Sequence, residues 1–294
     1  MKTLGIDLGG TKIAAAVVDD GKVLKESIVP TPQTGFDAVL AAMSKLAESL
    51  LRDFPEVERV GVGSPGPLDL KEGTVLFAPN IPGMTDAPIV EGLKQALAKE
   101  VVLENDANAA GYAEHLYGAA TDLETSIFIT ISTGIGGGLF IGDQVIHGAH
   151  SIAGEIGHMI VQLHGPLDGD GHYGTLESIA AGRAIARDAS YSYGQAMDTR
   201  EVFSRAQDGE RKALKIIDNA ALFTGIGIAN LHKIFNPEGF VIGGGMSQVG
   251  RFYLDKIQAA VELYCEGYPP VILREAKLGT EAGVIGAASV ALKL

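Results

Sequence analysis

The sequence predicts an α/β fold with two similar halves, and three observations support this prediction. Strand and helix patterns alternate along the 294 residues. An apolar strand, a glycine-rich turn and a second apolar strand occur in this order twice, at 4–14 and at 129–139. A third glycine turn, at 243–245, follows a strand and precedes a helix. We therefore expect mixed sheets that are covered by helices.

The first half begins with three strands and continues with helices between further strands. Apolar residues at 39, 43, 46 and 50 keep the spacing of one helix face, whereas the strands are short apolar runs that end at glycine or proline turns. Loops with two prolines each, at 64–67 and 79–83, interrupt the pattern. The expected elements are strands at 3–8, 12–18, 22–28, 59–63 and 101–103, and helices at 36–52, 89–98 and 106–117.

The second half begins with the repeated strand pair and then becomes mostly helical. We expect helices at 176–187, 199–207, 210–235 and 248–264, a strand at 240–243 before the third glycine turn, and a last helix at 282–293. The predicted domains are a smaller one, 1–117 with the C-terminal helix 282–294, and a larger one, 118–281.

Composition and charge exclude several classes of partner. The chain has 23 Lys and Arg against 36 Asp and Glu, for a formal net charge of −13. An acidic chain without a basic cluster argues against nucleic acid and against an anionic membrane surface. Residues 125–142 carry no charge, but five glycines and five Ser or Thr make a buried hairpin a better interpretation than a membrane span.

Cysteine use and the N-terminus indicate a cytoplasmic protein. Cys265 is the only cysteine, so neither an intrachain disulfide nor a cysteine metal site is expected. The first residues lead directly into a strand that contains Asp7, which is not the pattern of a signal peptide.

The repeated glycine turns predict a phosphate site. Glycine lets backbone N–H groups approach an anion closely, and the hydroxyls of Thr11, Ser132 and Thr133 add donors. Two such turns that face each other would hold a polyphosphate from both sides, as a kinase or an ATPase requires. Asp7 lies in an apolar strand, where a carboxylate is costly without a partner, and Mg²⁺ held through water would supply one. A plain hairpin turn is the alternative for 9–10, and a plain tight turn is the alternative for 243–245.

These motifs together resemble the ROK family of sugar kinases and repressors, within the actin-like ATPase (ribonuclease H-like) fold. The resemblance is carried, in the expected order, by residues 7–12, 104–110, 131–148, 154–158 and 176–178 with 182–183. It implies two α/β domains with a cleft between them, and ATP-dependent phosphorylation of a hexose at its 6-hydroxyl. Glucose is the expected sugar, as in the glucokinases and hexokinases of this family, which serve glycolysis.

The resemblance also assigns site residues. ATP and Mg²⁺ are the expected cofactors, and the residues implied for them are Asp7, Gly9, Gly10, Thr11, Lys12, Thr133, Gly134, Gly136, Gly244 and Gly245. The residues implied around the hexose are Gly66, Asn80, Asn105, Asp106, Glu155, His158 and Glu177. Asp106 is the expected catalytic base, which accepts the proton of the attacking hydroxyl, although Asn105 and Asp106 both also suit a helix N-cap. A helix N-terminus favours the ionised carboxylate.

One motif departs from the family pattern. Many ROK proteins bind zinc through the histidine that corresponds to His158 and three cysteines, but Asp168, Asp170 and Thr175 replace those cysteines here. These are poor zinc ligands by comparison, so no structural zinc is expected. His164 and His172 leave open an adventitious metal.

Three alternatives remain from the sequence. The sugar could be mannose, fructose, allose or an N-acetylhexosamine, because the implied pocket residues are widely shared. A sugar-responsive repressor is disfavoured, because such repressors carry a basic helix-turn-helix domain ahead of the sugar module. A sugar-binding module without activity is disfavoured because Asp7, Thr11 and Asp106 are all present. Relatives suggest a homo-oligomer, either a dimer or a tetramer.

Overall fold

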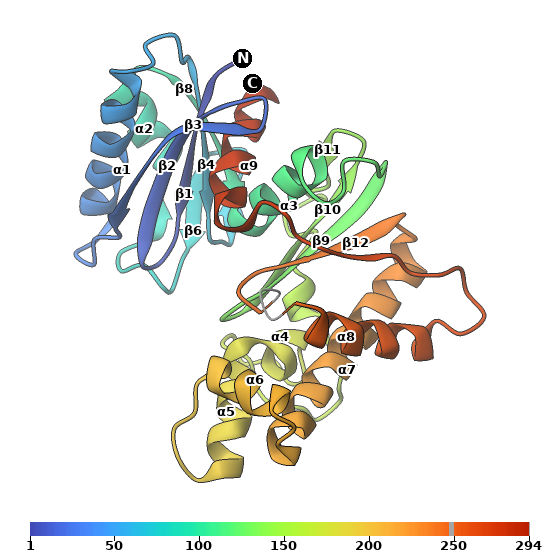
Figure 1. The fold of residues 1–294 in the computed structure, drawn as a ribbon. Helices are drawn as coiled ribbons and strands as arrows, with labels where there is room; N and C mark the ends of the chain where they lie inside the picture. The colour runs from blue at the N-terminus through green and yellow to red at the C-terminus, as the bar shows by residue number, and fades with distance from the viewer. Residues whose placement is uncertain (247–249, 294) are drawn as a thin grey trace. The chain divides into compact units, whose positions relative to one another are not determined.

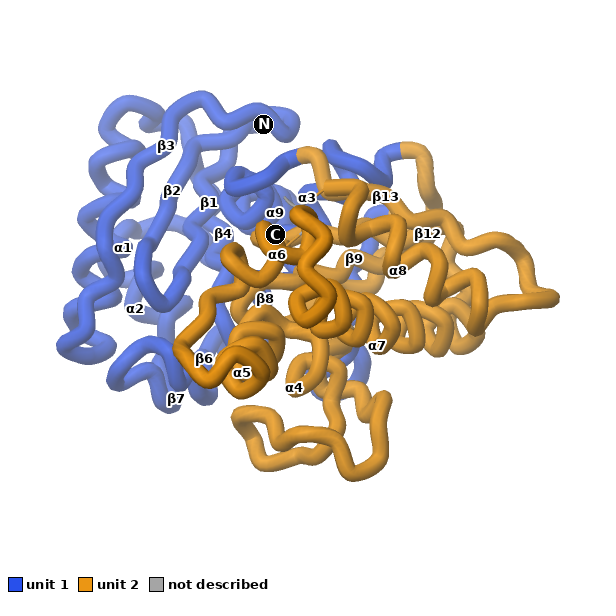
Figure 2. The backbone as a smooth tube through the Cα atoms, turned by 60° about the horizontal axis from the view of Figure 1, so that its bottom comes forward, with its two compact units in different colours: residues 1–121, 143–153, 278–294 blue, residues 122–142, 154–277 orange. Residues whose placement is uncertain are grey.

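A computed structural model describes residues 1–246 and 250–293. The chain forms two compact units: residues 1–121, 143–153 and 278–294 make the first, and residues 122–142 and 154–277 make the second (Figure 2). The chain therefore passes between the units four times. The predicted domains, 1–117 with 282–294 and 118–281, differ from these units mainly in the segment 143–153, and their boundary stays a prediction.

The first unit is built on a five-stranded sheet in the order β3-β2-β1-β4-β8 (Figure 1). Its strands are β1 (Thr3–Leu8), β2 (Lys12–Asp19), β3 (Lys22–Pro30), β4 (Arg59–Ser64) and β8 (Glu100–Asn105). The first three are antiparallel, whereas β4 and β8 run parallel to β1. Parallel strands end at the same edge of a sheet, so the chain leaves β1, β4 and β8 on one side.

Helices cover both faces of this sheet. They are α1 (Phe36–Leu51), α2 (Ile89–Leu97), α3 (Asp106–Tyr117) and α9 (Ala282–Val290). Successive strand residues point to opposite faces, and in β2 the alternation divides the residues between two cores. Ile13, Ala15 and Val17 pack with the α1 and α2 residues. Ala14, Ala16 and Val18 pack with residues of α3 and α9.

Glycine allows α9 to lie directly on the sheet. A Cβ at Gly5 would come within 2.0 Å of the carbonyl oxygen of Val284, and one at Gly61 within 1.8 Å of that of Ala287. A Cβ at Gly286 would meet the carbonyl oxygen of Ala109 in α3 at 1.7 Å. The three glycines therefore fix how closely β1, β4, α3 and α9 approach one another.

Several short strands were not predicted. They form a small antiparallel sheet of the first unit, made of β5 (Leu68–Asp69), β6 (Thr74–Phe77) and β7 (Thr85–Ala87). By contrast, β11 (Gln144–Val145), in the segment 143–153, is the third strand that the sequence predicts after the polar turn at 142–144. A strand of two to four residues shows no periodicity in a sequence, which is why β5, β6 and β7 were not predicted.

The second unit holds the repeated strand pair and a helical region. Its strands run in the order β10-β9-β12-β13, and β12 is parallel to both of its neighbours. Their bounds are β9 (Thr125–Ile131), β10 (Ile135–Ile141), β12 (Gly239–Gly243) and β13 (Leu273–Glu275). The helices are α4 (Leu176–Ala180), α5 (Gly182–Tyr193), α6 (Thr199–Gln207), α7 (Arg211–Phe235) and α8 (Arg251–Tyr264).

Three predicted helices differ in their extent. The helix expected at 176–187 is two helices, because Ala181 is extended and the N–H of Gly182 donates to the carbonyl of Ser132 at 2.8 Å. The helix expected from Gln248 is described from Arg251, since Gln248 lies outside the described residues. The last helix ends at Val290, and a 3₁₀ turn, Ala291–Lys293, follows it.

One helix in the described part of the chain, α7, is long and apolar enough to cross a membrane by length and composition. Half of its most apolar stretch is buried within the protein, and α7 packs against α6 and α8. Packing within the unit therefore accounts for much of its apolar character. Cys265, directly after α8, is also buried.

Candidate active site

The glycine turn of the first unit joins β1 to β2 at residues 9–11. Gly9 closes the turn by donating its N–H to the carbonyl of Lys12 at 3.0 Å, and the Thr31 hydroxyl donates to the carbonyl of Gly9 at 2.6 Å. A Cβ at Gly10 would lie 3.2 Å from Asn80, so two predicted site residues from separate motifs are neighbours. The side chains of Thr11 and Lys12 are exposed beside them.

Asp7 is a half-buried carboxylate near the end of β1. Burial raises its pKa to about 6, the negative charge of Asp106 adds to this shift, and Lys12 opposes it. Gly283, in the first turn of α9, lets the backbone approach this carboxylate, since a Cβ there would lie 2.6 Å from Oδ2. A nearby cation would favour the charged form of this group and lower its pKa.

Asp106 follows β8 as the first residue of α3. Asn105 is the N-cap, and its Oδ1 accepts the N–H groups of Ala107 at 2.9 Å and Asn108 at 3.2 Å. Asp106 also accepts the N–H of Ala107, at 2.7 Å. Burial nevertheless raises the pKa of Asp106 above its usual range. The helix N-terminus was expected to keep this carboxylate a weak base, but desolvation has the larger effect.

The junction between β8 and α3 is held by a residue pair that sequence reasoning missed. Glu104 is buried, and its Oε1 accepts the Asn105 N–H at 2.8 Å and the Asn108 side-chain amide at 3.0 Å. Its Oε2 lies 2.6 Å from Nε2 of His147, which raises the pKa of that imidazole. Because His147 lies in the segment 143–153, far along the chain, no local pattern revealed it.

Gly66 completes the cluster in the first unit. An added Cβ at Gly66 would lie 3.6 Å from Nδ2 of Asn105. The register of the parallel strands explains the grouping, because Asp7 pairs with Gly63, and Ser64 with Asn105. The predicted residues of this unit therefore gather at the carboxyl edge of its sheet, which is where α/β proteins place their ligands.

The glycine turn of the second unit joins β9 to β10. The N–H of Ser132 donates to the carbonyl of Gly134 at 2.9 Å, and the N–H of Ile135 donates to Oε2 of Glu177 at 2.8 Å. Residue 134 must be glycine, because a Cβ added there would come within 2.3 Å of Oε2 of Glu177. Glu177 also pairs with Arg183 at 2.8 Å. The structure thus places Glu177 against this turn, while its predicted contact with the hexose stays a prediction.

The third glycine turn lies beside the second. Gly244 has φ of +85° and packs on Ile131, and Met246 donates its N–H to the carbonyl of Ile131 at 3.0 Å. A Cβ at Gly245 would lie 3.7 Å from Oγ of Ser132. The two predicted nucleotide turns of this unit are therefore neighbours, with glycines at their contact.

Glu155 and His158 form a pair on a short 3₁₀ turn, Ile156–His158. Oε2 of Glu155 lies 3.8 Å from Nε2 of His158, so the spacing of three residues does place them on one side. A Cβ at Gly157 would meet the carbonyl of Ile135 at 2.1 Å, which ties this turn to the start of β10. Nδ1 of His158 faces Asp168 at 3.5 Å.

Two of the residues that replace the zinc cysteines, Asp168 and Asp170, lie within 4 Å of the His158 imidazole. Oδ1 of Asp168 accepts the N–H groups of Asp170 at 3.0 Å and His172 at 2.8 Å, whereas Thr175 is the N-cap of α4. Among the described residues, His158, Asp168 and His172 can offer ligand atoms within 4.8 Å of one another.

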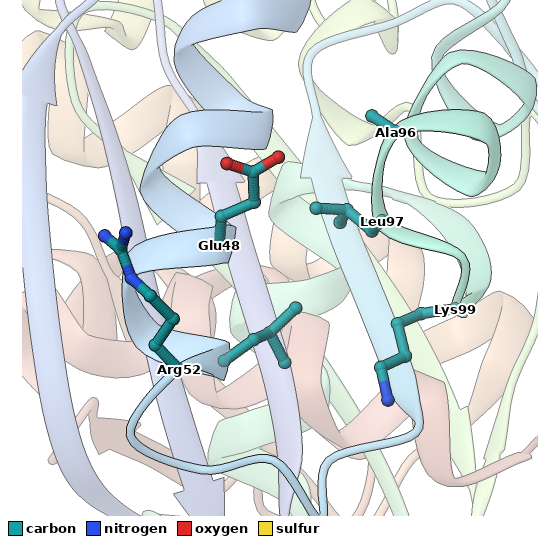
Figure 3. A pocket seen from close by; sticks show the side chains of 6 residues that line it. Glu48, Arg52, Ala96, Leu97 and Lys99 are labelled. Carbon is teal, nitrogen blue, oxygen red and sulfur yellow. The ribbon is translucent and has the colours of Figure 1, made fainter.

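A hollow elsewhere on the first unit is not the candidate site. It is lined by Glu48, Leu51, Arg52, Ala96, Leu97 and Lys99, at the ends of α1 and α2 (Figure 3). Lys99 precedes β8, so this hollow lies at the amino edge of the parallel strands. The predicted residues of this unit lie at the opposite edge.

Comparison with known proteins gives a consistent result. The model of the ROK family matches residues 3–294. The crystal structure of a ROK hexokinase from Thermus thermophilus has a TM-score of 0.93 and 44% identity, and covers 100% of this chain and 98% of that one. A ROK glucokinase from Streptomyces griseus, solved with glucose and AMPPNP, has a TM-score of 0.86 and 34% identity, with 100% of both chains covered.

Two curated relatives of similar identity to this chain are named as kinases of different sugars. The glucokinase of Streptomyces coelicolor is 36% identical, over 98% of this chain and 97% of its own. The N-acetylmannosamine kinase of Haemophilus influenzae is 33% identical, over 98% of this chain and 94% of its own. The predicted actin-like ATPase fold is confirmed by these structural matches.

Proposed function

This chain belongs to the ROK family, and from that premise we propose that it transfers the γ-phosphoryl group of ATP to the 6-hydroxyl of a hexose, with glucose as the preferred sugar. The observation that carries the proposal is Asp106, a carboxylate of raised pKa at the carboxyl edge of the first sheet. The similarity to a glucokinase solved with glucose and AMPPNP supports the same reaction.

In this reaction Asp106 acts as the general base. It accepts the proton of the sugar hydroxyl while the oxygen attacks the γ-phosphorus. The transition state of phosphoryl transfer is loose, so most of the rate comes from alignment and charge neutralisation. A raised pKa brings the carboxylate closer to the working pH and improves proton acceptance. Asn105, as the N-cap, and Glu104, through its bonds to Asn105 and Asn108, hold the helix end in place.

The glycine turns bind the phosphates and the nucleotide. Turns 9–11 and 133–136 offer backbone N–H groups and hydroxyls to the polyphosphate, and Gly244 and Gly245 lie under the nucleoside. Asp7 suits a Mg²⁺ ion held through water, because burial and the charge of Asp106 raise its pKa despite Lys12, and a further cation would stabilise the ionised carboxylate. The metal, when bound with ATP, neutralises phosphate charge.

The hexose is bound by groups that match its hydroxyls. The amides of Asn80 and Asn105, the carboxylates of Glu155 and Glu177, and the imidazole of His158 supply both donors and acceptors. Several of these groups already have partners within the described structure. Glu177 supports the turn at 134–135, Asn105 caps α3, and His158 faces both Asp168 and Glu155.

A kinase of the same family for N-acetylmannosamine is the second candidate. The 33% identity to the enzyme from Haemophilus influenzae favours it over mannose or fructose. The sugars of the two candidates differ at carbon 2, in both the substituent and the configuration. A coupled assay for ADP release with glucose, mannose, fructose, N-acetylmannosamine and N-acetylglucosamine distinguishes them by kcat/KM.

We propose further that the enzyme works in the cytoplasm as a homo-oligomer and has neither nucleic acid nor membrane as a partner. The formal net charge of −13 supports the absence of polyanionic partners. Light scattering coupled to size exclusion measures the oligomeric state, and a dimer or a tetramer is the expected result.

Asp106→Asn tests the proposed chemistry. Asparagine keeps the shape of the side chain but cannot accept the proton, so kcat falls at least about a hundredfold while sugar binding persists. The measurements are ADP release with Mg-ATP and calorimetric titration with glucose. Asp208→Asn, at the exposed C-terminal end of α6, is the matched control and keeps its activity. If Asp106→Asn retains full kcat, the assignment of the base is wrong.

A further inference from the structure

One oxygen of Glu104 binds the chain on both sides of Asp106. Oε1 of Glu104 accepts the backbone N–H of Asn105 at 2.8 Å and the side-chain amide of Asn108 at 3.0 Å. Asn105 in turn caps α3, because its Oδ1 accepts the N–H groups of Ala107 and Asn108. Asp106 therefore lies between two residues that the same carboxylate holds.

This carboxylate is buried and has a cationic partner. The side chain of Glu104 is 2% exposed, and its second oxygen, Oε2, lies 2.6 Å from Nε2 of His147. Within the described part of the chain, Glu104 forms no other ion pair. The hydrogen bond raises the pKa of His147, although burial and the charge of Lys293 oppose this shift. A buried carboxylate that loses its partner is costly, so without His147 the side chain would turn toward water.

His147 belongs to the segment 143–153, which other contacts fix to the same unit. The carbonyl of Asp143 accepts the hydroxyl of Tyr112, in α3, at 3.0 Å. The N–H of Ala153 donates to the carbonyl of His147 at 3.1 Å, which closes the segment into a loop. The backbone of this histidine is therefore held independently, and its imidazole can fix the carboxylate that it contacts.

We propose that His147 is a positioning residue for the catalytic base: its bond to Glu104 fixes the first turn of α3 and thereby the direction of the Asp106 carboxylate. This inference rests on the function proposed for Asp106. A general base must lie within hydrogen-bonding distance of the hydroxyl that it deprotonates, and a displacement of about 1 Å can cost roughly a hundredfold in rate. A residue that holds the helix end can therefore change kcat without touching the sugar or ATP.

Amide hydrogen exchange, measured without sugar or nucleotide, tests the positioning itself. His147→Ala removes the bond to the carboxylate, so the N–H groups of Asn105, Ala107 and Asn108 should exchange at least about tenfold faster. Exchange in α1 serves as the reference for any loss of overall stability, which the increase at the helix end must exceed. His150→Ala, at an exposed histidine of the same segment, is the matched control and leaves this exchange unchanged.

Steady-state kinetics test the consequence for the base. The value of kcat is calculated per folded chain, with the folded fraction taken from urea denaturation at the assay pH. His147→Ala should lower kcat at least about tenfold while KM for ATP stays within about twofold, because the interaction that is weakened belongs to the transition state. His147→Gln should recover part of kcat, because its side-chain amide can donate to Glu104. A merely structural role would leave kcat per folded chain unchanged.

The two measurements separate this proposal from the proposed function. An increase in exchange at the helix end that is no larger than the increase in α1 overturns the proposal, whatever the activity is. An unaltered chain that phosphorylates no hexose contradicts the proposed function, and the exchange result then still decides whether His147 orders the helix end. In an active enzyme, an unchanged kcat in His147→Ala, or equal kcat in His147→Ala and His147→Gln, overturns the positioning of the base.

Discussion

Asp7 and Asp106 show how the register of a sheet can bring two carboxylates together. The pKa of Asp7 is raised by burial and then by the charge of Asp106, so the two groups oppose each other's ionisation. Structural carboxylates usually have cationic partners that lower their pKa values, as Arg274 lowers that of Asp122 to about 2. The opposite shift at Asp7 is typical of functional sites and agrees with the binding role proposed for it.

Asp7→Asn should raise the free energy of unfolding at neutral pH. A carboxylate whose folded pKa is raised to about 6 stabilises the folded state while protonated and loses that contribution as the pH rises through 6. The variant should therefore be more stable than the unaltered protein at pH 8, by about 1–2 kcal/mol, and the difference should vanish near pH 4. Urea denaturation across this range measures it. A difference that does not depend on pH contradicts the assignment.

His147→Gln should lower stability most at acidic pH. The raised pKa of His147, due first to its hydrogen bond with Glu104, stabilises the fold while the imidazole is charged. This contribution is present below the ordinary histidine pKa and is lost as the pH rises through the higher folded value. Since the side chain is 36% exposed, we expect a loss on the order of 1 kcal/mol at pH 5.5 and less at pH 9. Urea denaturation checks this, with His150→Gln as the control.

Among single residues, the sequence identified those whose signal is local. Asp7 is conspicuous as a charge in an apolar strand, and Asn105 and Asp106 stand together at the end of another strand. His147 gave no such signal, because its role comes from Glu104, 43 residues earlier in the chain. His172 was noted only as a possible metal ligand, since its approach to Asp168 depends on how the loop folds.

At the level of elements, the contact between α9 and the sheet depends on the absence of side chains. Gly61→Ala should lower the free energy of unfolding by at least about 2 kcal/mol, because the new Cβ would meet a backbone oxygen, which cannot rotate away. In the native structure that oxygen lies 1.8 Å from the position of the added atom. Chemical denaturation measures the effect.

A matched control for Gly61→Ala is Gly169→Ala. Gly169 has open space around its Cβ position and lies outside the left-handed region, so this substitution should change stability by less than about 0.5 kcal/mol. Equal effects of the two variants would show that the approach of α9 is not what requires glycine at 61.

The long elements were predicted well and the short ones poorly. Helices α1, α3 and α6 begin at the predicted residues. In α3 and α6 the side chains of Asn105 and Asp198 accept N–H groups of the first turn, so the start of each helix has a local cause. The break between α4 and α5 was missed, because its cause is a hydrogen bond from Gly182 to the distant Ser132. Alanine and glycine at 181 and 182 do not by themselves end a helix pattern.

For the molecule as a whole, each unit is assembled from separate stretches of chain. Residues 1–121 contain the first sheet with α1, α2 and α3, but α9 comes from the far end of the sequence. Without α9, the β2 residues Ala14, Ala16 and Val18 lose much of their apolar cover. We therefore expect that the contiguous segment does not fold independently.

A fragment of residues 1–121 should fail to fold on its own. The exposed apolar face and the missing contacts with α9 should give a poorly dispersed amide NMR spectrum and no cooperative melting transition. Joining residues 278–294 to this fragment through a flexible linker should restore dispersion. A dispersed spectrum from residues 1–121 alone would contradict the role given to α9.

The general architecture was predictable because the glycine turns repeat and because strands and helices alternate throughout. The assignment of residues 143–153 to the first unit was not, since nothing in that segment distinguishes it from its surroundings in sequence.

The buried Cys265 makes this protein convenient for spectroscopy. Because the only thiol is shielded from solvent, a cysteine introduced at an exposed position would be the one that reacts with a maleimide dye. A pair of such cysteines, one in each unit, would allow energy transfer to report the separation of the units in solution. Adding hexose and a nucleotide analogue to the labelled protein would then reveal directly whether that separation changes during the catalytic cycle.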